Sequence, residues 1–249
     1  GVIDFDEPFK KLFNQGMING KNGIKMSKSK GNVVSPDDLV RDYGCDALRM
    51  YELFVGPPEL DAEWDDRGIE GVARFLNRFY NLVMDSKDKD IQETKEMVKL
   101  RHKLVYDIET RFNQFSLNTV VSGFMEYCNK LTDVAKKEGG IDKETLKTFV
   151  ILLAPFTPHL GEELWRELGG TDSVFHATWP ECDEEAMKDD EIEVAVQVNG
   201  KVKAVIMVPA DIAKEDAIAA GKAAVEGKIT GNIVKEIYVP KKIVNLVVK

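Results

Sequence analysis

Five consecutive residues place two lysines and two serines around one methionine: Lys25, Met26, Ser27, Lys28 and Ser29. Such a loop is suited to polyphosphate, because lysine ammonium groups act as mobile point charges and hydroxyl and backbone N–H groups donate to phosphate oxygens. Positioned cations also stabilise the charge that builds on phosphate oxygens during their transfer reactions. Gly23 precedes the string and Gly31 follows it, and we expect both glycines to act as hinges. The residue types therefore predict a loop that binds ATP phosphates.

A basic run also has a plainer interpretation, as a solvated surface loop or a localisation signal. The order of the residues argues against it. The string is identical to the second signature of class I aminoacyl-tRNA synthetases, and a match of five ordered residues rarely arises by chance. The residues that follow, 30–49, resemble the subgroup that handles leucine, isoleucine and valine.

The resemblance extends over essentially the whole chain and is strongest over residues 8–83 and 192–249. It continues at Pro57, Pro58 and Trp64 and along the stretch 68–78. Together these positions most resemble the bacterial leucyl branch of the family. An isoleucine or valine enzyme is the alternative, since the amino-acid pocket that would decide between them is expected outside this chain.

The resemblance implies that the full-length protein activates leucine with ATP and transfers it to tRNA(Leu), as a cytoplasmic and monomeric enzyme. Lys28 would contact the ATP phosphates, and Lys25 would close the loop or bind the same phosphates. Ser27 and Ser29 would donate hydrogen bonds, while Met26 would anchor the loop on an apolar surface. Mg²⁺ is expected with ATP in the full enzyme, and no metal-ligating residues are predicted in this chain.

The family's first signature, His-Ile-Gly-His, has no counterpart around the three histidines, His102, His159 and His176. The amino-acid pocket and the editing domain are likewise expected upstream. We therefore interpret the chain as the C-terminal part of the enzyme and predict that it does not activate leucine alone. The alternative from another functional class is a non-catalytic module that only binds tRNA.

The charge distribution bears on which parts meet RNA. The chain of 249 residues has a formal net charge of −9, but residues 1–30 and 192–249 each carry +3 and the region between them carries −15. Because phosphate attracts cations, the two ends are the better candidates for RNA contact. No apolar run reaches the roughly 18 residues of a membrane span. The three cysteines, Cys45, Cys128 and Cys182, are far apart, which fits a reducing cytosol.

The pattern predicts a multidomain, mainly α-helical protein, and the resemblance implies that its first part, residues 1–64, is the end of a catalytic domain. A short helix and a strand are expected before the turn at Asn19-Gly20. Ser35 is expected to cap a helix that begins at Pro36 and ends at Gly44. A second helix is expected from about Asp46 to Phe54. The two helices resemble the segment of class I synthetases that contacts the tRNA stem, and the alternative is that they are only packed connectors.

Residues 65–180 are predicted to form an α-helical bundle, and the resemblance implies that this bundle is the anticodon-binding domain. Four apolar stripes at helical spacing mark its helices: Ile69, Val72, Leu76, Phe79 and Val83; Val98, Val105, Ile108 and Phe112; Val120, Phe124, Cys128 and Leu131; Leu146, Phe149, Val150 and Leu153. Ser116 and Asp142 are expected to cap the third and fourth helices, and Pro158 to open a fifth. Arg74 and Arg78 are possible tRNA contacts, although such residues often only keep a surface soluble. His159 is expected to pack or cap rather than to catalyse.

An acidic linker is predicted over 181–191, followed by a small α+β domain over 192–249 with the order ββαββ. The residues alternate with a period of two on both sides of Asn199-Gly200, which is the strongest short signal for a β-hairpin. A helix is expected from about Lys214 to Val225, and two further strands over 233–239 and 242–248. Lys201, Lys203, Lys241 and Lys242 are possible tRNA contacts at strand ends, provided that they share a face.

Overall fold

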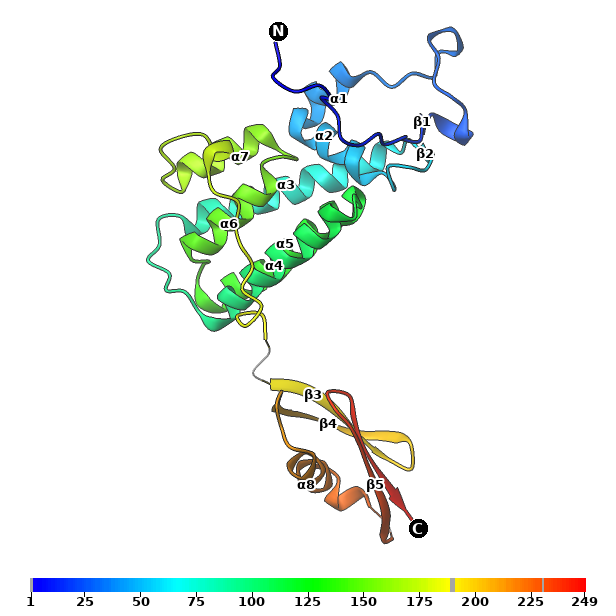
Figure 1. Cartoon of the computed structure of the whole chain (residues 1–249), viewed down its shortest axis with the longest axis vertical. Coiled ribbons are helices and arrows are strands. Elements are labelled where there is room, and N and C mark those ends of the chain that lie inside the picture. The colour runs from blue at the N-terminus through cyan, green and yellow to red at the C-terminus, as the bar shows by residue number, and fades with distance from the viewer. Residues whose placement is uncertain (1, 189–190, 230) are drawn as a thin grey trace. The chain divides into compact units, whose positions relative to one another are not determined.

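The computed structural model describes residues 2–188, 191–229 and 231–249. The chain divides into two compact units, Gly1–Met187 and Lys188–Lys249. The first unit is helical and the second is built on a sheet, as Figure 1 shows for each unit separately. No helix in the described ranges is both long and apolar enough to cross a membrane.

Seven α-helices in the described part of the first unit form its body. They are α1 (Pro36–Tyr43), α2 (Cys45–Phe54), α3 (Asp66–Ser86), α4 (Lys95–Asn113), α5 (Leu117–Glu138), α6 (Lys143–Leu153) and α7 (Pro158–Glu167). A 3₁₀ turn, η3 (Val174–His176), follows α7. One continuous hydrophobic core joins α2 and Trp64 to the bundle, so α2 packs with the helices that follow it.

The predicted apolar stripes account for most of this core. The stripes on α3, α5 and α6 are buried at every predicted position. The stripe on α4 was predicted wrongly at both ends, because Val98 is half-buried and Phe112 is 40% exposed. The buried face of α4 consists instead of Met97, Leu104, Val105 and Ile108. Both faces fit a 3.6-residue period, and packing against α5 and α6 selects between them.

The starts of three helices show when a local sequence signal correctly predicts a side-chain cap. Asp142 caps α6 as predicted, since its carboxylate accepts a hydrogen bond from the Thr145 N–H at 2.9 Å. Ser35 and Ser116 precede α1 and α5, but in the described chain neither hydroxyl accepts a capping bond. The prediction of side-chain caps there is wrong. Proline at the first helical position starts α1 with its φ already set, so that helix does not depend on the serine.

The segment before the signature loop is extended rather than helical, and the short helix predicted around Phe9–Phe13 is wrong. A two-residue strand, β1 (Ile18–Asn19), pairs in parallel with β2 (Ala62–Glu63). The Tyr51 ring packs edge-on against Trp64 at 4.9 Å between ring centroids, and its hydroxyl donates to the Asp65 carbonyl at 2.7 Å. This corner fixes β2 between α2 and α3.

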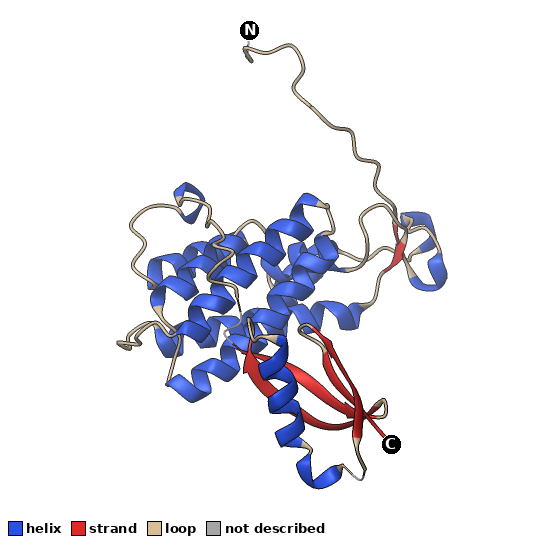
Figure 2. Ribbon diagram, turned by 60° about the horizontal axis from the view of Figure 1, so that its bottom comes forward, coloured by secondary structure: helices blue, strands red, loops and turns tan. Residues whose placement is uncertain are grey.

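The second unit is a four-stranded sheet with one helix packed against it. Its strands are β3 (Glu191–Val198), β4 (Lys201–Pro209), β5 (Ile233–Val239) and β6 (Ile243–Val248), and their order is β4-β3-β6-β5. β3 and β6 run parallel, whereas the outer pairs are antiparallel. Helix α8 (Lys214–Ala224) covers one face (Figure 2) and buries Ala217 and Ile218 against Val196, Val244 and Leu246. The predicted order ββαββ therefore holds in this unit.

The acidic segment 181–191 spans the boundary between the units. Cys182 packs against the helical core, and the Asp183 N–H donates to the His102 ring at 3.1 Å. Its first residues thus belong to the helical unit, while residues 189 and 190 lie outside the described residues.

Candidate functional site

The lysines of the signature string lie in a loop between β1 and α1. Lys25 and Lys28 are exposed, and among the described residues neither ammonium group has an ion-pair partner. Met26 is half-buried and packs against the helical core. The loop thus presents two cations to solvent, while the Met26 side chain holds its backbone against the helical core.

The centre of the loop is a single 3₁₀ turn, η2 (Lys28–Lys30), which begins after Ser27. The hydroxyl groups of Ser27 and Ser29 lie 2.8 Å apart and share one hydrogen bond. Gly31 ends the turn at φ 64°, a left-handed conformation that costs glycine little. The hydroxyls therefore stand beside Lys28 on one short turn, where a polyphosphate would find both a cation and donors.

The stem of the loop is fixed to the helical unit through β2. The Ala62 N–H donates to the Met17 carbonyl at 2.9 Å, and the Trp64 N–H donates to the Asn19 carbonyl at 2.8 Å. At the next turn the Asn22 N–H donates to the Glu63 carboxylate at 2.9 Å. The loop is therefore mounted directly on the segment that leads into α3.

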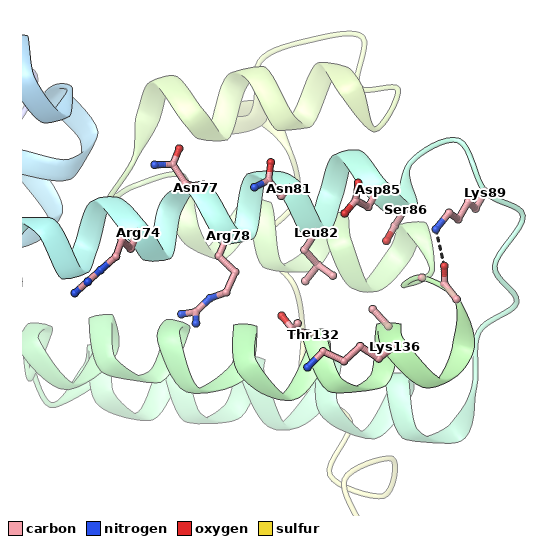
Figure 3. Close-up of a pocket in the computed structure, with 13 residues that line it drawn as sticks. Arg74, Asn77, Arg78, Asn81, Leu82, Asp85, Ser86, Lys89, Thr132 and Lys136 are labelled. Carbon is pink, nitrogen blue, oxygen red and sulfur yellow. Dashed lines mark hydrogen bonds between the residues drawn. The ribbon is translucent and has the colours of Figure 1, made fainter.

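A second polar region is a groove between α3 and α5 (Figure 3). Four polar residues of α3 line this groove, and their spacing of three and four residues places them on one face of the helix. They are Arg74, Asn77, Arg78 and Asn81. Lys136 extends from the α5 side, where it pairs with Asp133 at 2.8 Å. Arg74 and Arg78 are exposed, so the structure brings these two predicted residues together on one surface.

Two other arginines of the bundle have structural partners. Arg101 is only 13% exposed and pairs with Glu93. The Arg111 guanidinium donates to the Thr119 carbonyl at 2.7 Å and fills the space beside Gly123. These side chains hold loops and helices together, which leaves Arg74 and Arg78 as the better candidates for an external ligand.

The four lysines singled out in the second unit do not gather at one end of its sheet. The Ala195 N–H of β3 donates to the Lys242 carbonyl at 3.1 Å, so Lys242 lies beside the first half of β3. The turn before Lys201 lies beside the far end of β6, where the Val248 N–H donates to the Asn199 side chain at 2.8 Å. The turn that carries Lys241 and Lys242 therefore lies toward one end of the sheet, and Lys201 lies toward the other. All four side chains are exposed, and Lys203 lies where the ladder between β3 and β4 is irregular.

Two of the three histidines each pair with an aspartate. The His159 ring lies 2.9 Å from the Asp46 carboxylate at the start of α7, and the His176 ring lies 2.9 Å from Asp172. The Asp172 carboxylate raises the pKa of His176. Within the described ranges, no three histidine, cysteine or acidic residues are grouped as a metal site would require.

Some residues of these sites escaped sequence reasoning. Asn32 bonds across the signature loop, and the available signal was its place directly after Gly31, since Gly and Asn are both common in turns. Asn77 and Asn81 share the groove with Arg74 and Arg78, and their spacing of three and four residues along one predicted helix was the available signal.

Comparison with known proteins assigns the chain to a family. The model described as "Anticodon-binding domain of tRNA ligase" matches residues 94–218, which is half of the chain. The chain belongs to this tRNA ligase family. A second model, for class I tRNA synthetases of the I, L, M and V group, matches residues 2–65, which include the signature loop.

Named relatives of this tRNA ligase family agree with the leucyl resemblance. The leucine–tRNA ligase of Petrotoga mobilis is 45% identical over all of this chain, and that of Fervidobacterium nodosum is 44% identical. The crystal structure of a ternary complex of Agrobacterium radiobacter K84 agnB2 LeuRS, tRNA and LeuAMS matches the whole chain with a TM-score of 0.77 and 31% identity. The chain spans about a third of the length of each: 33% and 32% of the two ligases and 35% of the solved chain.

Proposed function

We propose that this chain is the C-terminal part of a leucine–tRNA ligase that works in the cytoplasm as a monomer. In the full-length enzyme it supplies the ATP-phosphate loop and surfaces that bind tRNA(Leu). The single observation that carries this proposal is the signature loop, with Lys25 and Lys28 exposed on a stem fixed to a tRNA ligase fold.

The reaction needs stabilisation of phosphate charge more than proton transfer by this chain. A carboxylate oxygen of leucine attacks the α-phosphorus of ATP, the bond from that phosphorus to the bridging oxygen breaks, and pyrophosphate leaves. Lys28 contacts the phosphates as their charge shifts toward pyrophosphate, and Lys25 binds the same group or holds the loop over it. Ser27 and Ser29 exchange their mutual hydrogen bond for bonds to phosphate oxygens.

The same enzyme then transfers leucine to tRNA(Leu). A ribose hydroxyl of the terminal adenosine attacks the carbonyl carbon of leucyl-adenylate, and AMP leaves. Arg74 and Arg78 on the α3–α5 groove contact the RNA backbone, and the lysines of the second unit do so at separate points. Mg²⁺ would arrive with ATP, because residues 25–32 offer ammonium and hydroxyl groups but no carboxylate that could hold it.

The deciding experiment is Lys28→Ala in the full-length enzyme, measured by leucine-dependent ATP–pyrophosphate exchange. Loss of a charge that acts in the transition state should lower the exchange rate about a hundredfold. Lys11→Ala, which removes an exposed lysine outside the loop, is the matched control and should leave the rate unchanged. Exchange within a few-fold of wild type in the Lys28 variant would refute the assignment.

A second measurement separates the ligase from a module that only binds tRNA. The 249-residue chain alone should bind tRNA(Leu) yet show no leucine-dependent exchange, whereas the full-length protein should show both. A full-length protein without exchange activity would favour the binding module.

A further inference from the structure

The side-chain amide of Asn32 bridges the signature loop. Its Oδ1 accepts a hydrogen bond from the Ser27 N–H at 2.8 Å, and its Nδ2 donates to the Lys25 carbonyl at 3.3 Å. One side chain thus bonds to both sides of Met26, much as a neighbouring strand would. The bridge closes residues 25–32 into a small ring.

Besides this bridge, the ring is restrained by the Met26 side chain, which packs against the helical core, and by two backbone hydrogen bonds. Inside it, the Lys30 N–H donates to the Ser27 carbonyl at 3.1 Å, and the Gly31 N–H donates to the Lys28 carbonyl at 3.2 Å. These bonds shape the turn of Lys28 but do not tie it to the stem. Asn32 provides that tie, because it is half-buried where the loop returns to the helical unit.

The space that Asn32 occupies depends on Gly20 in the stem. Gly20 is buried, and a Cβ added to it would lie 3.2 Å from Asn32 Nδ2 and 3.3 Å from the Asn32 carbonyl oxygen. The Gly20 N–H donates to the Ile24 carbonyl at 2.9 Å, immediately after β1. The amide is therefore seated on a part of the stem that β2 already fixes.

We propose that Asn32 is a positioning residue for Lys28, which it holds in reach of the phosphates by closing the base of the loop. This inference rests on the proposed function of the loop. Without the amide, the backbone of residues 25–29 gains conformations that phosphate binding must restrict again. Displacement of the Lys28 ammonium group should also lower the reaction rate, because a small misplacement of a stabilising group weakens its interaction with the transition state.

Two single variants and their combination test the proposal in the full-length enzyme by ATP–pyrophosphate exchange. Asn32→Ala should lower the rate constant about tenfold, with a smaller change in the KM for ATP. Because Asn32 acts through Lys28, adding Asn32→Ala to Lys28→Ala should cause little further loss. A rate for Asn32→Ala within twofold of wild type, or fully multiplicative losses in the double variant, would overturn the proposal.

The two proposals fail in different ways. If Lys28→Ala has no effect, the proposed function of the loop is wrong and the positioning role falls with it. If Lys28→Ala is slow but Asn32→Ala is not, only the positioning role is wrong. Asn14→Ala removes an exposed asparagine from the same part of the chain, and as control it should retain the wild-type rate.

Further variants distinguish positioning from damage to the fold. Asn32→Asp keeps the acceptor for the Ser27 N–H and should recover part of the rate that Asn32→Ala loses. Gly20→Ala keeps every side chain of the loop but crowds the Asn32 amide, and it should slow ATP–pyrophosphate exchange. In the 249-residue chain, Asn32→Ala should speed amide hydrogen exchange of Ser27 about tenfold while the core amides of α5 stay protected. Unchanged protection of the Ser27 amide would contradict the bridge.

Discussion

Asp46, in the first turn of α2, holds His159, in the first turn of α7, through a hydrogen bond of 2.9 Å between the carboxylate and the ring Nδ1. The same carboxylate accepts from the backbone N–H of Leu160 at 2.7 Å. Thr157 precedes α7, and its hydroxyl donates to the Leu153 carbonyl instead of capping the helix. The start of α7 is therefore capped from another helix, 114 residues earlier in the chain.

Asp46→Ala should destabilise the helical unit by about 1–2 kcal/mol, because it removes the acceptor for a helix N-terminus. Asp46→Asn retains one oxygen acceptor and should lose less. Urea unfolding followed by circular dichroism measures the difference, and Asp37→Ala, an exposed aspartate on α1, serves as control. Equal stability of Asp46→Ala and wild type would show that water replaces the cap at no cost.

The α3–α5 groove should contribute to RNA binding through charge. The double variant Arg74→Ala, Arg78→Ala in the full-length enzyme should weaken tRNA(Leu) binding, and the slope of log affinity against log salt should fall by about 1 for each lost phosphate contact. Filter binding at several salt concentrations measures both quantities. Arg67→Ala removes an arginine that pairs with Asp65 outside the groove and should change neither.

Two glycines in helices should respond to alanine in opposite directions. A Cβ on Gly161 would lie 2.8 Å from the Ala154 Cβ, so Gly161→Ala should destabilise by about 1–3 kcal/mol through overpacking of α7 against the end of α6. Nothing lies within 4 Å of a Cβ on Gly71 in the described structure, so Gly71→Ala should stabilise α3 by about 0.5–1 kcal/mol. Thermal unfolding of the two variants checks the signs. A stabilised Gly161 variant would mean that α7 can move away.

The ion pair of His176 and Asp172 should be visible in a pH titration. A hydrogen bond and the charge of Asp172 raise the pKa of His176, so the folded protein holds this proton to a higher pH than the unfolded chain does. The pair therefore supports folding below the pKa of unfolded histidine, and its contribution is lost as the pH rises through the folded pKa. NMR titration of the imidazole should show a lower pKa for His176 in Asp172→Asn. An unchanged value would show that the pair does not persist in solution.

Patterns that a single element satisfies by itself could be predicted from the sequence. Asn199 adopts φ 49° and Gly200 φ 78°, which is the left-handed pair that a two-residue hairpin needs. Asp142 caps α6 because both partners lie within one turn of the chain. The apolar stripes of α3, α5 and α6 are buried at every predicted position, because the helical period places the residues of each stripe on one face.

Features that depend on distant partners could not be predicted in this way. The residues around Phe9 are apolar enough for a helix, yet the chain is extended there as it approaches β1, whose partner β2 lies over 40 residues later. The cap of α7 comes from α2, and the Asn32 bridge depends on space left by Gly20. The signature string identified the loop, but only the fold shows how its stem is mounted on β2.

The position of β6 has a consequence for how the second unit can be made. β6 is the latest of the described strands along the chain, but it lies inside the sheet between β3 and β5. The β3–β4 hairpin can form as soon as it leaves the ribosome, whereas β5 has no partner until β6 also emerges. The sheet therefore closes only once residues 243–246, which pair with β3, have been made. A stop codon at 243 would leave β5 separate from the β3–β4 hairpin, not merely shorten an edge of the sheet.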